Sequence, residues 1–243
     1  MSKALKLALE SIISAALIFG VPNLASTQTK TDYIIQVANH SRDKKEVEKF
    51  NQGLKSKGYM PQTDITHLVD GATLYYSIFE IKSDSDKKSI DKSLTEKTNA
   101  YCESIEKSIF YDEKEIRKTI RNFTRAILSE NIDRAYSFFS ESAYTTSGDE
   151  KNKITREMLK ESFEKQDYKK FRLDDIIKDN SDIIYSYEEI KKKFADKKDA
   201  IKELGMKNKD YLVELNFNKE FLENKWFFLF RKIKDNWKII AFN

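Results

Sequence analysis

The sequence is poor in residues that build several common kinds of functional site. It contains one cysteine, two histidines, six glycines and two prolines among 243 residues. The single cysteine, Cys102, excludes an internal disulfide, and its place in a helical apolar pattern favours a buried thiol over a reactive one. The scarcity of glycine and proline argues against long flexible linkers and low-complexity tracts.

Motifs of metal and phosphate chemistry are also missing. The sequence has no glycine-rich phosphate loop, no HExxH or CxxC spacing and no Gly-x-Ser-x-Gly elbow. His40 and His67 are separated by a predicted helix and turn, which gives no register for a shared metal ion. We therefore predict no metal site, no cofactor and no assignable catalytic residue.

The charged residues are numerous but balanced. There are 44 Lys and Arg against 40 Asp and Glu, a net charge of +4. Segments such as KKEVEK and KKKFADKKDAIKE alternate in sign, as solvated helix faces do. No basic stretch runs free of acids, so we predict that nucleic acid is not a partner. With 40% hydrophobic residues, the length predicts two modest domains.

The first 25 residues have the order of a secretory signal peptide. Lys3 and Lys6 precede an apolar run over residues 7–24, and the small residues Ala25 and Ser26 follow it. An uncleaved short membrane anchor and an ordinary amphipathic helix are the alternatives, although Glu10 would be costly within a membrane. We expect an exported protein, either periplasmic or secreted. If the N-terminal helix is not cleaved, it anchors the protein in the membrane.

Residues 30–111 are expected to form an α+β domain. A β-branched run over 33–37 predicts a strand, and a helix follows that ends at Gly58. Two further strands are predicted over 63–69 and 74–81, then a second helix that includes Ile90 and Ile105. The order β-α-β-β-α is that of a ferredoxin-like domain without its final strand, for which residues 108–111 are the candidate.

This region resembles a SPOR domain, a βαββαβ module that binds peptidoglycan glycan strands through one face of its sheet. The resemblance rests on Tyr33-Ile34-Ile35-Gln36-Val37, on Lys57-Gly58-Tyr59 and on Leu74-Tyr75-Tyr76-Ser77-Ile78. It implies four glycan-binding candidates: Tyr33, Gln36, Tyr75 and Tyr76. Ser77 and Glu80 stand near the places where the family usually has an arginine and a glycine. A generic ferredoxin-like domain is the alternative.

Residues 112–243 predict three helices followed by strands. Ile116, Ile120, Phe123 and Ile127 form one helical stripe. A second helix with Ala135, Phe138 and Phe139 on its apolar side is expected after Asn131, then a polar loop over 140–153 and a third helix with Met158, Leu159 and Phe163 facing inward. Strands are expected over 170–178, 182–187, 211–217, 225–232 and 237–242, with an inserted helix over 188–208.

Three helices and a curved antiparallel sheet that ends in Asn236-Trp237-Lys238-Ile239-Ile240 resemble the NTF2-like (cystatin-like cone) superfamily, more narrowly its exported domains of unknown function. The fold often holds an apolar pocket between its first helix and the sheet. The resemblance implies six ligand-pocket candidates: Phe123, Tyr136, Phe139, Phe217, Phe228 and Trp237. Each of them also fits a plain hydrophobic core, since aromatic stripes at this spacing pack cores first.

Three functions remain open from the sequence. The first is an exported, non-enzymatic envelope protein that binds cell-wall glycan (peptidoglycan), a partner protein or a small apolar ligand. The second is a small lyase or isomerase that uses an acid in the cone, because neither histidine lies in this half. The third is an oligomerising scaffold, in which a homodimer forms through the sheet of the NTF2-like domain. Fold resemblance alone does not choose among them.

Overall fold

A computed structural model describes residues 34–81, 90, 103–147, 150–165, 167–173, 177–193, 205–217 and 226–242. The chain divides into two compact units, Leu24–Lys118 and a second that includes Thr119–Asn243. We refer to them as the N-terminal and C-terminal units. The predicted signal peptide, residues 1–25, and Cys102 lie outside the described residues.

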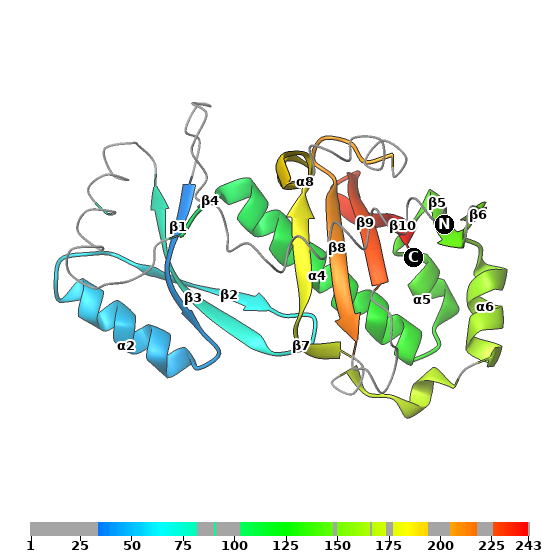
Figure 1. Cartoon of the computed structure of the whole chain (residues 1–243). Coiled ribbons are helices and arrows are strands. Elements are labelled where there is room, and N and C mark those ends of the chain that lie inside the picture. The colour runs from blue at the N-terminus through cyan, green and yellow to red at the C-terminus, as the bar shows by residue number, and fades with distance from the viewer. Residues whose placement is uncertain are drawn as a thin grey trace. The chain divides into compact units, whose positions relative to one another are not determined.

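The N-terminal unit contains a four-stranded sheet. Its elements are β1 (Ile34–Ser41), α2 (Lys44–Lys55), β2 (Gln62–His67), β3 (Thr73–Ile81) and β4 (Glu103–Glu106). The strand order is β2-β3-β1-β4, and every neighbouring pair is antiparallel. Figure 1 shows α2 lying along this sheet.

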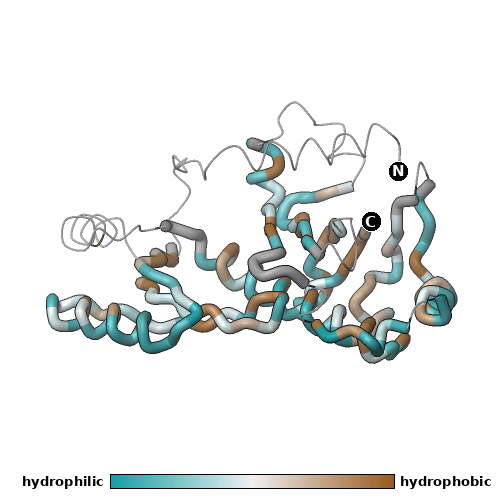
Figure 2. The backbone as a smooth tube through the Cα atoms, turned by 60° about the horizontal axis from the view of Figure 1, so that its bottom comes forward, coloured by the Kyte–Doolittle hydropathy of each residue, from teal (hydrophilic) through white to brown (hydrophobic). Residues whose placement is uncertain are grey.

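Local sequence explains where α2 begins and ends. The carboxylate of Asp43 accepts a hydrogen bond from the backbone N–H of Lys45 and so caps the first turn. Gly58 has φ +87°, a left-handed conformation that a glycine adopts without steric cost after a helix. Val47 and Leu54 are buried, while most of the helix is hydrophilic (Figure 2). One apolar stripe therefore attaches α2 to the sheet.

Helices cover both faces of this sheet. On one face, Leu54 of α2 packs with Ala38 and Phe79. On the other face, Phe110 packs with Ile35 and Ile78. Phe110 belongs to α4 (Lys107–Leu128), whose residues up to Lys118 fall in the N-terminal unit.

The end of the N-terminal unit differs from the sequence prediction. Residues 108–111, expected to form the last strand, are the first turns of α4. The last strand is instead β4, which pairs with β1 at the edge of the sheet, and Ile105, predicted in a helix, lies opposite Ile35 in its register. Pairing with a strand some 70 residues earlier in the chain overrides the local helical spacing of this segment.

The C-terminal unit takes the second half of α4 and a six-stranded sheet. The remaining elements are α5 (Ile132–Tyr136), β5 (Phe139–Ser147), β6 (Glu150–Lys153), α6 (Arg156–Lys165), the 3-10 helix η1 (Tyr168–Lys170), β7 (Ile177–Ser186), α8 (Tyr187–Lys193), β8 (Tyr211–Phe217), β9 (Trp226–Ile233) and β10 (Asn236–Phe242). The strand order is β6-β5-β10-β9-β8-β7. Both units thus mix helices and strands, as the predicted α+β class requires.

Several predicted elements of this unit were wrong. Phe139 is not on a helix but begins β5, which pairs with β10 in parallel, so the sheet is not wholly antiparallel. The expected polar loop over 140–153 is the β5–β6 hairpin. The expected strand over 170–178 gives way to η1 and the start of β7. These strands are polar, and partner strands elsewhere in the chain decide their conformation.

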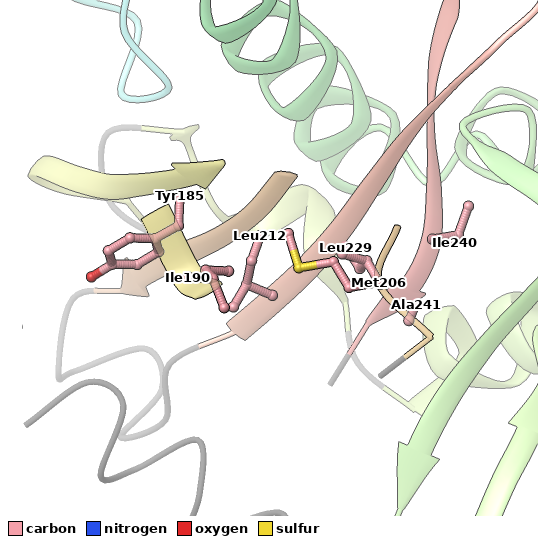
Figure 3. Close-up of a cluster of buried hydrophobic side chains, with 7 residues drawn as sticks. All are labelled: Tyr185, Ile190, Met206, Leu212, Leu229, Ile240 and Ala241. Atoms are coloured by element: carbon pink, nitrogen blue, oxygen red, sulfur yellow. The ribbon is translucent and has the colours of Figure 1, made fainter. Parts of the chain in front are cut away.

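The six-stranded sheet is buried on both faces. Phe123 of α4 contacts Phe228 of β9 on one face. The other face carries Tyr185, Leu212, Leu229, Ile240 and Ala241, which pack with Ile190 of α8 and with Met206 (Figure 3). Among the described residues, no helix combines the length and apolar character needed to cross a membrane.

Candidate functional site

Aromatic rings occupy the space between α4 and the six-stranded sheet. The centroid of Phe123 lies 5.3 Å from that of Phe139 and 5.9 Å from that of Phe228, both in edge-to-face geometry. Phe228 in turn stacks on Phe242 at 5.8 Å. Phe123, Phe139 and Phe228 are all less than 7% exposed. Three of the six pocket candidates therefore pack together through Phe123, in the edge-to-face arrangement that aromatic pairs prefer.

The other three pocket candidates have different immediate neighbours. Trp237 is buried at the start of β10 with its ring 5.3 Å from that of Tyr211, and its indole Nε1 has no hydrogen-bond partner among the described residues. Tyr136 is half-buried in α5, beneath the guanidinium of Arg156 at 5.3 Å. Phe217 ends β8, opposite Ile177 in register. Trp237 nevertheless lies on the same face of the sheet as Phe228, because Tyr211, which it contacts, is opposite Phe230 in register and Phe230 packs on Phe228.

A lyase or isomerase that used the cone would need an acid of this half as its base. Asp133 is exposed and pairs with Arg156 at 2.9 Å. Asp182 is half-buried on β7, and residues 174–175 lie outside the described residues. Glu214 of β8 is completely buried. It faces away from α4, because its register partners Ile183 and Phe227 both pack against the hydrophobic cluster on the opposite face.

The surroundings of Glu214 perturb a neighbouring tyrosine. Burial in the hydrophobic cluster, and after it the nearby Glu214 and Glu189 carboxylates, raise the pKa of Tyr185 to about 12. The sequence does contain a signal for this burial, since Tyr211-Leu212-Val213-Glu214-Leu215 is a nearly continuous apolar run, typical of a strand covered on both faces. Glu214 interrupts that run, and periodicity alone did not mark it as buried.

A buried ion pair fixes the segment before β8. Asp210 is 2% exposed, and its two carboxylate oxygens accept from Nε and Nη2 of Arg231 at 2.9 and 2.6 Å. The same carboxylate accepts from the backbone N–H of Lys207, and Arg231 also donates to the carbonyl of Gly205. This fork places Met206 over the sheet. Sequence reasoning did not single out either residue, because alternating charges also surround them on the surface.

The glycan-binding candidates fall on different sides of the N-terminal sheet. Tyr33 lies outside the described residues, and Gln36 is in β1 opposite Phe79 and Ser104. Tyr76 packs edge to face on Phe110 of α4, with ring centroids 5.5 Å apart. Tyr75, the next residue of β3, points to the opposite face and lies beside Ile65 of β2. The two tyrosines do not form a shared surface.

Helix α4 is held onto the Tyr76 face by ion pairs as well. Nζ of Lys114 donates to Asp64 of β2 at 2.7 Å, and Nζ of Lys107 donates to Glu80 of β3 at 3.0 Å. The face that carries Tyr76 is therefore covered within the N-terminal unit.

The two histidines make contacts within the N-terminal unit. His67 makes a hydrogen bond to Thr73 across the β2–β3 pair, and His40 lies with its ring 5.9 Å from that of Tyr76. The described segments contain no group of three His, Cys, Asp or Glu side chains placed to hold a metal ion.

Comparisons with known proteins give distant similarities. No protein-family model matches the sequence, and no curated protein matches it. A solved structure described as an NTF-2 like protein of unknown function from Shewanella oneidensis MR-1 has 13% identity and a TM-score of 0.29, and the match covers 54% of this chain and 96% of that one. A second, described as a putative calcium/calmodulin dependent protein kinase II association domain from Xanthomonas campestris, has 12% identity and a TM-score of 0.26, with 54% and 84% covered. No activity follows from similarity this low.

Proposed function

We propose that the chain is an exported, non-enzymatic binding protein, with an NTF2-like C-terminal unit that acts through its surface and not through an internal pocket. The assignment of the C-terminal unit is supported by the three helices α4, α5 and α6 together with a six-stranded sheet, of which β5 and β6 lie between α5 and α6 in the chain. Its further support is the contact of α4 with one face of that sheet through Phe123 and Phe228. Export rests on the signal-peptide pattern of the first 25 residues.

One observation carries the non-enzymatic part of the proposal. Phe123, Phe139, Phe228 and Phe242 pack ring against ring in the place where a cone-shaped fold would hold a ligand. The fully buried carboxylate of Glu214 is on the other side of the sheet, and the buried carboxylate of Asp210 is paired with Arg231. A general base has to reach the proton that it removes, and here the acid and the aromatic interior are separated by the sheet.

A panel of small apolar ligands tests this proposal. We expect the native chain to show no saturable change in tryptophan fluorescence with any of them, since close-packed aromatic rings leave no room for entry. Saturable binding that is lost in a Phe123→Trp variant, which adds bulk to the interior, would overturn the filled-interior proposal. An Ile233→Trp variant, altered at an exposed position of β9, is the matched control.

Glycan binding by the N-terminal unit is a second proposed function. Its support is the strand order β2-β3-β1-β4 with α2 between β1 and β2, the plan of ferredoxin-like and SPOR-like modules. Tyr75 is half-buried beside Ile65, which is 43% exposed, at a part of the sheet face that α2 does not fully cover. We expect purified glycan strands without stem peptides to retain the chain, and Tyr75→Ala to weaken retention more than Tyr59→Ala. Absence of retention removes this function.

A further inference from the structure

The basic residues of α4 differ in whether an acid neutralises them. Lys107 pairs with Glu80, Lys114 with Asp64, Arg117 with Glu113 and Lys118 with Glu115. Arg121 and Arg125, the last two, have no ion-pair partner among the described residues, and no acid lies three or four residues from either along the helix. The contrast is confined to the second half of α4, which belongs to the C-terminal unit.

The two arginines lie on neighbouring turns of one helix. Residues four apart have Cβ atoms about 5–6 Å from each other, so the two guanidinium groups are placed side by side. Like charges at this spacing destabilise a helix. The position of Arg125 in the last turn is favourable, because the helix dipole attracts cations there. That account does not cover Arg121, one turn further from the end.

Arg121 is also partly withdrawn from water. Its Nε atom is buried and has no hydrogen-bond partner among the described residues, although a buried donor without an acceptor is costly. Arg121 as a whole residue is half-buried, whereas Arg125 is exposed. Burial, and after it the nearby charge of Arg125, lower the pKa of Arg121, in agreement with the absence of a neighbouring anion.

We propose that Arg121 and Arg125 form a binding site for a phosphate group carried by a ligand or partner of the C-terminal unit. A guanidinium donates two parallel hydrogen bonds to an oxyanion, and for Arg121 the donors would be the terminal nitrogens, because Nε is buried. Two cations side by side match a doubly charged phosphate better than a singly charged carboxylate. The bound group would accept hydrogen bonds from the terminal nitrogens of the two guanidinium groups and would neutralise the repulsion between the two arginines.

The test is a titration of the full chain with inorganic phosphate at pH 7 and constant ionic strength, followed by calorimetry and by thermal unfolding. We expect saturable binding and a rise in Tm that follows phosphate concentration. Arg121→Gln and Arg125→Gln should each weaken binding about tenfold or more, the scale of one charge-assisted contact. Lys118→Gln removes the same charge from an exposed pair on the same helix and should change affinity less than about twofold.

Two further arms separate the alternatives. Acetate in place of phosphate should bind at least about tenfold more weakly; equal affinity would overturn the phosphate assignment in favour of a carboxylate. Arg121→Lys keeps the charge but loses the fork, and it should also weaken binding. Without phosphate, Arg121→Gln should unfold at or above the native Tm, because it relieves the repulsion between Arg121 and Arg125. An unchanged or higher Tm would show that the variant is folded and that its loss of binding is not due to unfolding. Equal phosphate binding by all variants, or none by the native chain, overturns the site.

Discussion

Phe123 of α4 and Phe228 of β9 meet edge to face with ring centroids 5.9 Å apart, and both side chains are buried. Helix and sheet of the C-terminal unit are joined at this contact. Phe139 of β5 touches Phe123 from the other side, at 5.3 Å. Side chains of β9 and β5 therefore both pack on the ring of Phe123 from α4. This packing occupies the space between α4 and the sheet in which a pocket would have to lie.

Truncation of a phenylalanine side chain at this contact should strongly destabilise the fold. We expect Phe228→Ala to lower the free energy of unfolding by about 3–5 kcal/mol, the cost of removing a buried phenyl ring and leaving a cavity. Chemical denaturation of the full chain measures it. Ile233→Ala, on the same strand but 37% exposed, should cost less than about 1 kcal/mol. Similar losses for the two variants would show that Phe228 is not the packing centre described here.

The Asp210–Arg231 fork gives a second prediction. Asp210→Ala leaves the guanidinium of Arg231 without its acceptor, and we expect a loss of about 2–4 kcal/mol, less than for a fully buried pair because Arg231 keeps some contact with solvent. The exposed pair of Asp133 and Arg156 is the comparison, and Asp133→Ala should cost less than about 1 kcal/mol. Urea unfolding of both variants decides the matter, and equal losses would contradict a structural role for the fork.

Tyr185 predicts how stability changes at alkaline pH. Its pKa is about 12 in the folded chain and about 10 in an unfolded one, so between these values the folded state retains a proton that the unfolded state has lost. Stability from this residue is complete below pH 10 and is lost as pH rises toward 12, by up to about 2 kcal/mol. Tyr185→Phe should flatten this decline. The readout is the difference in Tm between native chain and variant, measured from pH 8 to 11.5; a constant difference would contradict the assignment.

The β9–β10 turn contains a conformational strain that a glycine would relieve. Lys234 and Asp235 have φ of +48° and +63°, values that L side chains adopt at a cost. Asp235→Gly should therefore raise the free energy of unfolding by about 0.5–1 kcal/mol, the relief being partly offset by the greater freedom of glycine in the unfolded chain. Lys232→Gly, inside the strand, should instead be destabilising. A thermal-shift comparison of the two variants checks the sign.

Much of this fold follows from residue pattern alone. The strand over 211–217 matches its prediction, because Tyr211 to Phe217 is rich in β-branched and aromatic residues. The helical stripe from Ile116 to Ile127 predicts α4, whose observed start at Lys107 lies nine residues before Ile116, where the predicted regular spacing begins. Strong local periodicity is sufficient to predict such elements without knowledge of their tertiary contacts.

Other elements depended on contacts that no local pattern contains. The polar β5–β6 hairpin exists because β5 pairs with the last strand of the chain. Met158 was expected to face inward, yet it is 38% exposed, since α6 buries none of its described side chains. The burial of Glu214 and the lack of a hydrogen-bond partner for Nε of Arg121 among the described residues likewise depend on tertiary structure. The predicted pocket residues were recognisable as aromatic, but only their packing distances distinguish a core from a ligand site.

The most direct test of the central claim is xenon binding, measured by NMR on the native chain and on Phe228→Ala. The filled interior predicts that dissolved xenon leaves the resonances of Phe123, Phe139 and Phe242 unchanged in the native chain and shifts them in the variant, where truncation opens an apolar cavity. Saturable shifts of these three residues in the native chain would show an open pocket between α4 and the sheet and would contradict the account.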